Sequence, residues 1–160
     1  GSRGLGDVYK RQPWMEFAKI TGMPQELKEK IGHLKYSSVQ TAYFPDNLDT
    51  EAQWIYYPDP ELSYHRILVR HNFCNGSKGY WTECNSTRVD ETTESTFQYM
   101  NQYAYPLNTI GKPEIMKELL EWAKARRVYG LGRWGEHQHY NSDLVVELAL
   151  KMAEELNSAQ

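Results

Sequence analysis

The sequence predicts an α+β fold in which an antiparallel sheet is flanked by helices. Over the middle of the chain, short runs rich in aromatic and β-branched residues alternate with polar turns, as consecutive sheet strands do. Toward both ends, other segments carry apolar residues at helical spacing. Because 40% of the 160 residues are apolar, the chain can bury one core.

The overall charge argues against nucleic acid or an anionic membrane as a partner, since the net charge is −3 and the pI is about 6.0. No apolar run approaches the about 20 residues of a membrane span and no signal peptide is visible, so we expect a cytoplasmic protein. Cys74 and Cys84 are expected to be reduced thiols on neighbouring strands. The 12 tyrosines and 5 tryptophans suit sheet packing and also clefts that bind sugars or other rings.

The first twelve residues, GSRGLGDVYKRQ, show no clear period and join abruptly to Pro13 and Trp14. They resemble translated sequencing adapter. We therefore expect residues 1–12 to be non-native and leave them out of the prediction of the fold, and we expect the natural chain to be a fragment of a longer protein that continues upstream of Pro13.

Two early segments have helical character. Trp14–Ile20 is expected to form a short turn or helix. Pro24–Leu34 is expected to form a helix, because proline suits the first helical position and three apolar residues fall on one face. These residues are Leu27, Ile31 and Leu34.

Five strands follow, joined by short polar turns, and such strands pair most simply as an antiparallel sheet. Pro58-Asp59-Pro60 ends the second of them, because proline cannot continue a central strand. The polar segment Ser86–Ser95 is expected to be either a loop or one helical turn. The strands are predicted at Tyr36–Phe44, Gln53–Tyr57, Tyr64–Phe73, Gly79–Cys84 and Phe97–Tyr105.

The C-terminal third is expected to form helix, strand and helix. Pro113–Arg126 carries Ile115, Leu119 and Trp122 on one face. Val128–Gly132 has the character of a short buried strand, and Ser142–Asn157 that of the last helix. A strand between two helices is normally part of a parallel sheet. The sequence offers it no parallel neighbour, so we expect its partners in missing upstream sequence.

The segment Gly130–Asp143, GLGRWGEHQHYNSD, combines a strand end, a glycine-rich turn with an arginine, and a helix N-terminus. Glycines allow the backbone to approach a flat, charged group closely. A helix N-terminus offers unpaired N–H groups and the positive end of the helix dipole. The geometry suits an anion or a carbonyl oxygen.

The stretch GRWGEHQHYNSD resembles the closing motif of FAD-dependent proteins of the amine-oxidase superfamily, above all the UDP-galactopyranose mutases. The resemblance implies the closing strand and helix of an FAD-binding Rossmann-like domain. It also implies that Arg133, Gly135 and Asp143 contact the cofactor, FAD. The alternatives are a helix-to-strand salt bridge for Arg133 and plain helix capping for Asp143.

Two more stretches resemble the same mutases. QWIYYPD, followed by YHR, is similar to their substrate-side sheet, and AYPLNT to their Tyr-Pro turn. The resemblance implies that Tyr56, Arg66 and Tyr105 bind the pyrophosphate of a sugar nucleotide, which a guanidinium and phenol hydroxyls can hold. The alternative for Arg66 is an ion pair with a carboxylate such as Glu83.

The motif departs from the mutases at two positions. His139 stands where they commonly carry a tyrosine, and Asn141 where some have an acidic residue. We expect His139 to bind the substrate's diphosphate and the protein to be a flavin binder but a poor mutase. His137 and His139 could suggest a metal, but no third ligand has suitable spacing.

These observations predict three regions: residues 1–12 non-native, residues 13–112 a substrate-side sheet region, and residues 113–160 the C-terminal part of an FAD-binding domain. The predicted function is that of a C-terminal fragment of an FAD-dependent oxidoreductase or mutase-like isomerase acting on a UDP-sugar or related substrate. Its partner would be the missing N-terminal half, with the GxGxxG turn that holds the ADP half of FAD. The fragment alone would not be an enzyme. The alternative is a stand-alone, aromatic-rich carbohydrate-binding module without catalysis.

Overall fold

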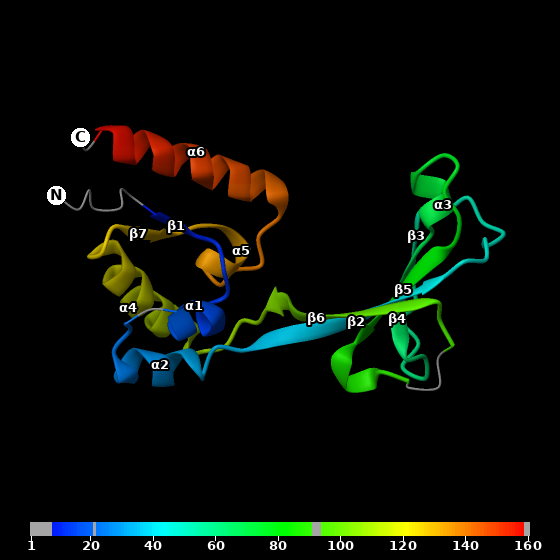
Figure 1. Ribbon diagram of the computed structural model, residues 1–160, viewed down its shortest axis with the longest axis horizontal. Coiled ribbons are helices and arrows are strands. Elements are labelled where there is room, and N and C mark those ends of the chain that lie inside the picture. Colours follow the sequence, from blue (N-terminus) through cyan, green and yellow to red (C-terminus); the bar gives the residue numbers. More distant parts are fainter. Residues whose placement is uncertain (1–7, 21, 91–93, 159–160) are drawn as a thin grey trace. The chain divides into compact units, whose positions relative to one another are not determined.

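The structure is a computed structural model that describes residues 8–20, 22–90 and 94–158. The chain forms two compact units (Figure 1). The terminal unit contains the residues up to Tyr36 and those from Tyr105 onward, and the sheet unit runs from Ser37 to Ala104. The domain boundaries predicted from the sequence stay a prediction.

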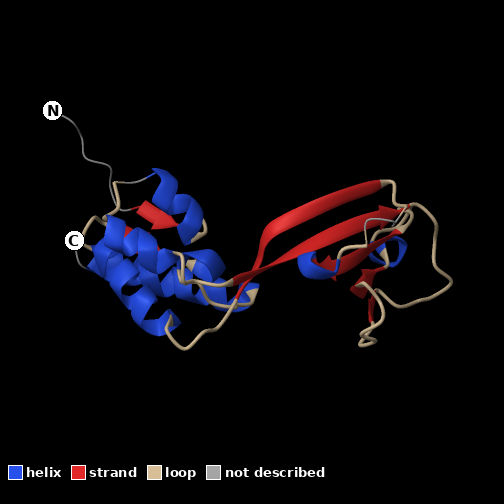
Figure 2. Ribbon diagram, turned by 90° about the horizontal axis from the view of Figure 1, so that it is seen from below, coloured by secondary structure: helices blue, strands red, loops and turns tan. Residues whose placement is uncertain are grey.

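The terminal unit is mainly helical, as the blue ribbons of Figure 2 show. Its helices are α1 (Trp14–Ile20), α2 (Gln25–Ile31), α4 (Lys112–Lys124), α5 (Gly132–Gly135) and α6 (Ser142–Ser158). Two short strands, β1 (Val8–Lys10) and β7 (Val128–Gly130), form a parallel pair.

The sheet unit is built on a five-stranded antiparallel sheet with the order β3-β4-β5-β2-β6. The fold is therefore α+β, as predicted. Strands β2 and β6, the first and last of this sheet in chain order, extend by one and two residues into the terminal unit. The strands are β2 (Tyr36–Phe44), β3 (Trp54–Tyr56), β4 (Tyr64–Leu68), β5 (Tyr80–Asn85) and β6 (Phe97–Pro106), with a helical turn α3 (Arg70–Phe73) and a 3₁₀ turn η1 (Ser86–Arg88).

The strand register decides which side chains share a face of the sheet. Arg66 lies opposite Tyr56 on one side and Glu83 on the other, and Leu68 lies opposite Trp54 and Trp81. Opposed residues of antiparallel strands project to the same face. This face, called the Arg66 face below, carries Tyr43, Trp54, Tyr56, Arg66, Leu68, Trp81 and Glu83.

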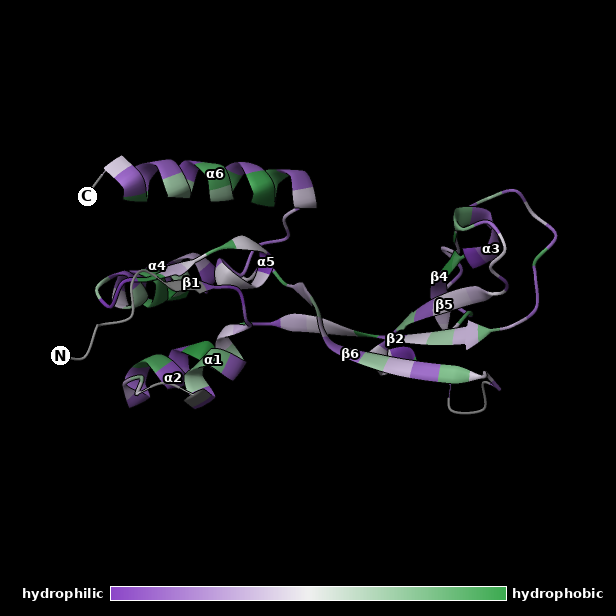
Figure 3. Ribbon diagram, turned by 45° about the horizontal axis from the view of Figure 1, so that its top comes forward, coloured by the Kyte–Doolittle hydropathy of each residue, from purple (hydrophilic) through white to green (hydrophobic). Residues whose placement is uncertain are grey.

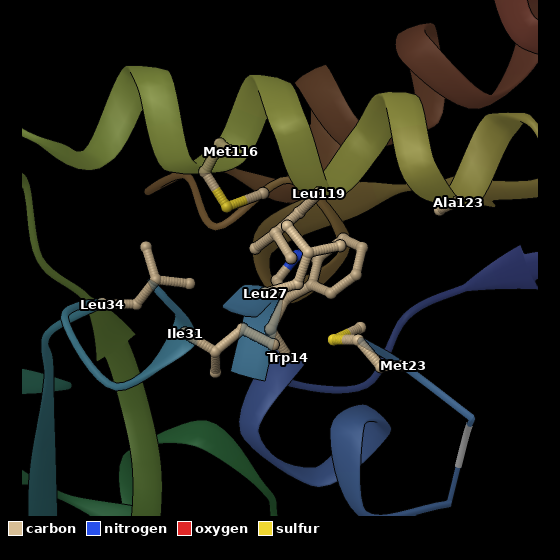
Figure 4. Close-up of a cluster of buried hydrophobic side chains, with 8 residues drawn as sticks. All are labelled: Trp14, Met23, Leu27, Ile31, Leu34, Met116, Leu119 and Ala123. Atoms are coloured by element: carbon tan, nitrogen blue, oxygen red, sulfur yellow. The ribbon is translucent and has the colours of Figure 1, made fainter. Parts of the chain in front are cut away.

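The core of the terminal unit lies between α1, α2 and α4 (Figure 4). Trp14 and Leu119 are completely buried, and apolar residues of α2 close the cluster. At the surface, Lys30 of α2 pairs with Glu118 of α4 at 2.5 Å. The cluster contains Trp14, Met23, Leu27, Ile31, Leu34, Met116, Leu119 and Ala123.

The predicted strand Tyr64–Phe73 is wrong in its second half, because β4 ends at Leu68 and Arg70–Phe73 forms a helical turn. The Asn72 side chain anchors this turn, since it donates to the carbonyls of Thr50 at 2.7 Å and Ala52 at 2.9 Å. The two cysteines are free, but only Cys84 lies in a strand.

The expectation that the strand at Val128 has no parallel neighbour in the chain was wrong. Val8 pairs with Val128 and Lys10 with Gly130, and Figure 1 shows β1 beside β7. Lys10, in the segment that the sequence analysis set aside, is 2% exposed, with its Nζ 3.9 Å from the centroid of the Trp14 ring. The adapter origin of the segment stays a prediction.

Helix α6 packs loosely. It buries none of its residues completely, and Figure 3 shows apolar residues, in green, along its length. Val146 and Leu150 are 60% and 63% exposed. In the described part of the chain, no helix combines the length and apolar character that crossing a membrane requires.

Leu119→Ala should lower the free energy of unfolding by about 2–5 kcal/mol, because it opens a cavity against Trp14 in the fully buried core. Urea denaturation followed by circular dichroism measures the change. Leu150→Ala, at an exposed site, is the control and should change stability by no more than about 0.5 kcal/mol. Equal losses in the two variants would contradict this placement of the core.

Candidate functional site

The glycine-rich segment after β7 turns sharply before α6. Leu131 ends the extended backbone and α5 makes a single helical turn. Gly132 has a φ of +76°, which favours glycine. Its N–H donates to the Glu136 carboxylate at 3.1 Å. Burial raises the pKa of Glu136, although this hydrogen bond opposes the shift.

Gly135 is required by contacts within the protein. A Cβ atom there would lie 2.4 Å from the carbonyl oxygen of Lys10 and 3.0 Å from the carbonyl carbon of Gly130. The carbonyl of Gly135 also accepts a hydrogen bond from the Trp14 indole at 3.1 Å. These contacts explain the glycine without a ligand, and its predicted contact with a cofactor stays a prediction.

Three of the residues predicted for the site meet in the terminal unit. The Arg133 guanidinium carbon lies 5.3 Å from the centroid of the Tyr105 ring, and Nη2 donates to the carbonyl of Tyr140 at 3.0 Å. The His139 ring lies 5.1 Å from that of Tyr105, centroid to centroid. The arrangement presents an arginine, a phenol and an exposed imidazole together, which can bind an anion.

A cavity of about 510 Å³ lies beside the turn. It adjoins the start of α6, where Asp143 is exposed in the first helical turn. Most of its walls are apolar or aromatic, and Arg133 and Arg11 contribute cations. The lining includes Leu131, Arg133, Trp134, Tyr140, Ser142 and Val145.

Lys112 is a buried cation that the sequence analysis missed. It is 4% exposed, and its ammonium donates to Asn108 Oδ1 at 2.5 Å, Gln138 Oε1 at 2.9 Å and the carbonyl of His137 at 3.1 Å. Burial lowers the pKa of Lys112. A lysine at the start of a helix is usually a surface charge, so no local signal revealed this role.

His137 is also buried, with a φ of +51°. Its Nε2 lies 3.0 Å from the carbonyl of Lys35, and its Nδ1 has no hydrogen-bond partner among the residues that the structure describes. Burial lowers the pKa of His137, and the nearby cations Lys112 and Lys10 lower it further. Lys112 and His137 together hold the turn that leads to His139. The described residues contain no cluster of three or more metal-ligating side chains.

Two other predicted residues, Tyr56 and Arg66, meet in the sheet unit. Arg66 pairs with Glu83, which confirms the alternative given for it from the sequence. Its guanidinium carbon lies 4.8 Å from the centroid of the Trp54 ring and 5.8 Å from that of Tyr56. The side chains of Arg66 and Glu83 are 16% and 15% exposed, so the pair is partly desolvated and still reachable.

A cavity of about 390 Å³ lies on the opposite face of the sheet. Gln40, Tyr64, Tyr80 and Cys84 are among its lining residues. The Cys84 thiol donates to Gln40 Oε1 at 3.7 Å, and burial raises its pKa. A raised pKa keeps the thiol protonated near neutral pH, so Cys84 is a poor nucleophile.

No family model and no curated protein matches the sequence. Solved structures do match. Reduced UDP-galactopyranose mutase is similar with a TM-score of 0.65 at 18% identity, over 81% of this chain and 36% of the mutase chain. A structure from Exiguobacterium sp. 255-15, described as "Putative protoporphyrinogen oxidase", is similar with a TM-score of 0.51 at 12% identity, over 79% of this chain and 36% of that chain. This chain thus spans just over a third of either protein and shares its fold over that part.

Gly135→Ala should destabilise the protein by about 1–3 kcal/mol, because the added methyl group overlaps the backbone of Lys10 and Gly130. Chemical denaturation without any ligand measures the loss. Gly111→Ala is the matched control, since no atom lies within 4 Å of a Cβ there. A Gly135→Ala variant as stable as the wild type would show that the backbone of Lys10 and Gly130 does not pack closely against position 135.

His137 should make stability depend on pH. The folded chain keeps this imidazole neutral, whereas the unfolded chain takes up a proton near pH 6.5. The unfolded state then binds more protons, so stability should fall as pH drops below about 6.5, by at most about 1.4 kcal/mol per pH unit.

The comparison is with His137→Gln, whose amide can still donate to Lys35. Denaturation at several pH values between about 5 and 7 should show a flatter dependence for this variant. Identical slopes in the wild type and His137→Gln would mean that His137 takes up its proton equally readily folded and unfolded.

Proposed function

We propose that the chain is the C-terminal part of an FAD-dependent protein that acts on a UDP-sugar or a related substrate. The fold shared with UDP-galactopyranose mutase supports the proposal, as do the resemblances at GRWGEHQHYNSD and QWIYYPD. The chain would supply one wall of a flavin site and a substrate-side sheet. The rest of the protein would supply the Gly-rich segment that holds the ADP half of FAD.

The observation that carries the proposal is the cavity beside the α5 turn. Its aromatic and aliphatic walls suit a planar ring, and the Arg133 guanidinium suits the polar edge of that ring. The adjoining N-terminus of α6 favours negative charge there by roughly 0.3–1 kcal/mol. The residues present therefore fit a flavin, which when bound would supply the electron-transfer chemistry.

In this proposal the predicted residues divide by unit. Arg133 lies on the flavin side of the terminal unit, which the exposed Asp143 at the start of α6 adjoins, and Gly135, packed against the backbone of Lys10 and Gly130, shapes the turn that carries Arg133. Tyr105 and His139, whose rings pack together, bind the substrate's diphosphate. In the sheet unit, Tyr56 and Arg66 contact the nucleotide sugar. A histidine in place of tyrosine at position 139 favours a flavoprotein with other chemistry over an efficient mutase.

The 160-residue chain alone should not retain FAD, because Arg133 and one helix end cannot replace the contacts of an ADP-binding segment. The test is to purify the chain with excess FAD and measure flavin absorbance after gel filtration. Stoichiometric flavin on the isolated chain would show that it is not one part of a split site.

The complementary test uses the source DNA. Sequencing upstream of the codon for Pro13 should reveal a Gly-rich βαβ segment, and the complete product should bind FAD. In that product, Arg133→Ala should weaken FAD binding at least about tenfold, or about 1.4 kcal/mol. The control is Arg126→Ala, which removes an exposed arginine that lies over the Trp122 ring. A complete product without flavin would refute the proposed function.

A further inference from the structure

The face of the sheet opposite the Arg66 face is hollowed beside a pair of stacked rings. The strand register places Ala42 opposite Thr82 and Phe44 opposite Tyr80, so these four side chains share this face. The rings of Phe44 and Tyr80 stack with centroids 5.0 Å apart and planes 12° apart, whereas Ala42 and Thr82 are short. Short side chains next to a ring pair leave room for the cavity of about 390 Å³ described above.

A third ring and a turn complete the walls of this cavity. Tyr64 of β4 lines it, and its ring packs edge-on against that of Tyr57 with centroids 5.2 Å apart. The turn before β4 contributes Glu61, Leu62 and Ser63. The N–H of Glu61 donates to the side chain of Asp59 at 2.9 Å, which fixes this turn. The three rings are half-buried, so they are held by their neighbours and still reach the cavity.

The charged side chains of the cavity wall are carboxylates. Glu61 and Asp90 line it, and both are exposed, so they lie at its rim. Among the described residues that form the wall there is no lysine, arginine or histidine. Arg88 follows β5 closely in the sequence, but it donates to the carbonyl of Pro60 and lines a different cavity.

The titration of Tyr80 reports the same negative environment. Burial raises the pKa of its phenol, and electrostatic interactions with neighbouring acidic groups raise it further. One of these groups is Asp46, which is ionised at neutral pH. Negative groups on three sides of the ring oppose an anion in the cavity and favour a cation.

The floor and walls of the cavity indicate which kind of cation fits. Ring faces attract a cation through their quadrupole, and a quaternary ammonium group presents methyl groups to them. A guanidinium or a primary ammonium requires hydrogen-bond acceptors instead. At the floor, Gln40 Oε1 already accepts from the Cys84 thiol at 3.7 Å, and the side chains of Ala42 and Ile67 offer no acceptor. Methyl groups therefore suit the floor and rings, and the carboxylates at the rim supply the opposite charge.

We propose that this cavity binds a quaternary ammonium group, with Phe44, Tyr64 and Tyr80 against its methyl groups and Glu61 as the opposite charge. The site lies on the other side of the sheet from the Arg66 face, so it is separate from the residues assigned to a nucleotide sugar and does not rest on the proposed function. A free compound such as choline and the headgroup of a phosphatidylcholine lipid carry the same group.

The test follows amide NMR shifts of the 160-residue chain during titration with choline chloride, while sodium chloride is lowered to keep the ionic strength constant. Choline should give saturable shifts in the residues that line the cavity, with a dissociation constant in the millimolar range. Two other compounds should bind at least about fivefold more weakly: methylguanidinium, and the neutral alcohol in which carbon replaces the nitrogen of choline.

Three outcomes would each overturn the proposal. Choline could give no saturable shifts at the cavity. The neutral alcohol could bind as tightly as choline, which would mean that the cavity selects shape and not charge. Methylguanidinium could bind at least as tightly as choline, which would mean that hydrogen bonds and not methyl groups decide the ligand.

Variants then separate the roles of the ring and the carboxylate. Tyr80→Leu should weaken choline binding at least about threefold, because it removes a ring face and keeps an apolar side chain. Tyr99→Leu, at an exposed position of β6, is its control. Glu61→Gln should weaken binding at least about twofold, and Glu51→Gln, which changes another exposed carboxylate of the sheet unit, is its control.

The variants remain informative if one of them fails to fold. Circular dichroism shows which variants fold, and Glu61→Gln changes an exposed side chain without changing its size, so it carries the test if Tyr80→Leu does not fold. Choline binding that is unchanged in every folded variant would overturn the proposal.

Vesicles of phosphatidylcholine distinguish the two sources of the group. A lipid headgroup as the ligand should make the vesicles broaden the same amide signals that choline shifts, whereas a free compound as the ligand should leave these signals unchanged when vesicles are added. The outcome is separate from that of the proposed function, because this chain is titrated without flavin and the proposed function is refuted by a complete product that lacks FAD.

Discussion

The mutual close approach of Gly130 and Gly135 is the constraint on which the candidate site depends. A Cβ on Gly130 would lie 2.6 Å from the carbonyl oxygen of Gly135, and one on Gly135 would lie 3.0 Å from the carbonyl carbon of Gly130. Only two glycines allow the backbone to fold back on itself this closely. The contact ends β7, forms α5 and directs Arg133 toward Tyr105.

The Trp14 side chain ties this contact to the hydrophobic core. Trp14 is fully buried among residues of α2 and α4, and its indole N–H donates to the Gly135 carbonyl. The packing of the helices therefore supports the turn that carries Arg133. On the other side of the turn, Lys112 binds the backbone of His137 and the side chain of Gln138. A candidate site placed between two such supports needs little reorganisation to bind a ligand.

The two units differ in the groups that pair with their buried or half-buried cations. In the terminal unit, the buried Lys112 has three neutral acceptors, and Arg133 bonds a carbonyl beside an aromatic ring. In the sheet unit, Glu83 balances Arg66. Positive charge with neutral partners favours anions, whereas a carboxylate already paired with the cation opposes them.

Local patterns in the sequence were sufficient for most elements. These patterns involve only neighbouring residues: proline at the start of a helix, apolar residues at helical spacing, and aromatic runs between polar turns. They predicted the helix that contains Leu119 and the strand Tyr36–Phe44. The alternative of an Arg66–Glu83 pair also came from the sequence, because both residues lie in strands predicted to be neighbours.

Tertiary structure alone decided the features that join distant parts of the chain. Val8 pairs with Val128, Lys112 is buried, and the backbone of Lys10 and Gly130 fills the place of a Cβ on Gly135. In each case the residues that meet share no sequence pattern. The helical turn at Arg70–Phe73 is likewise anchored by Asn72, whose side chain binds carbonyls some 20 residues earlier. Periodicity reports which face of an element is apolar, but burial and pairing depend on what packs against that face, and those atoms belong to remote segments.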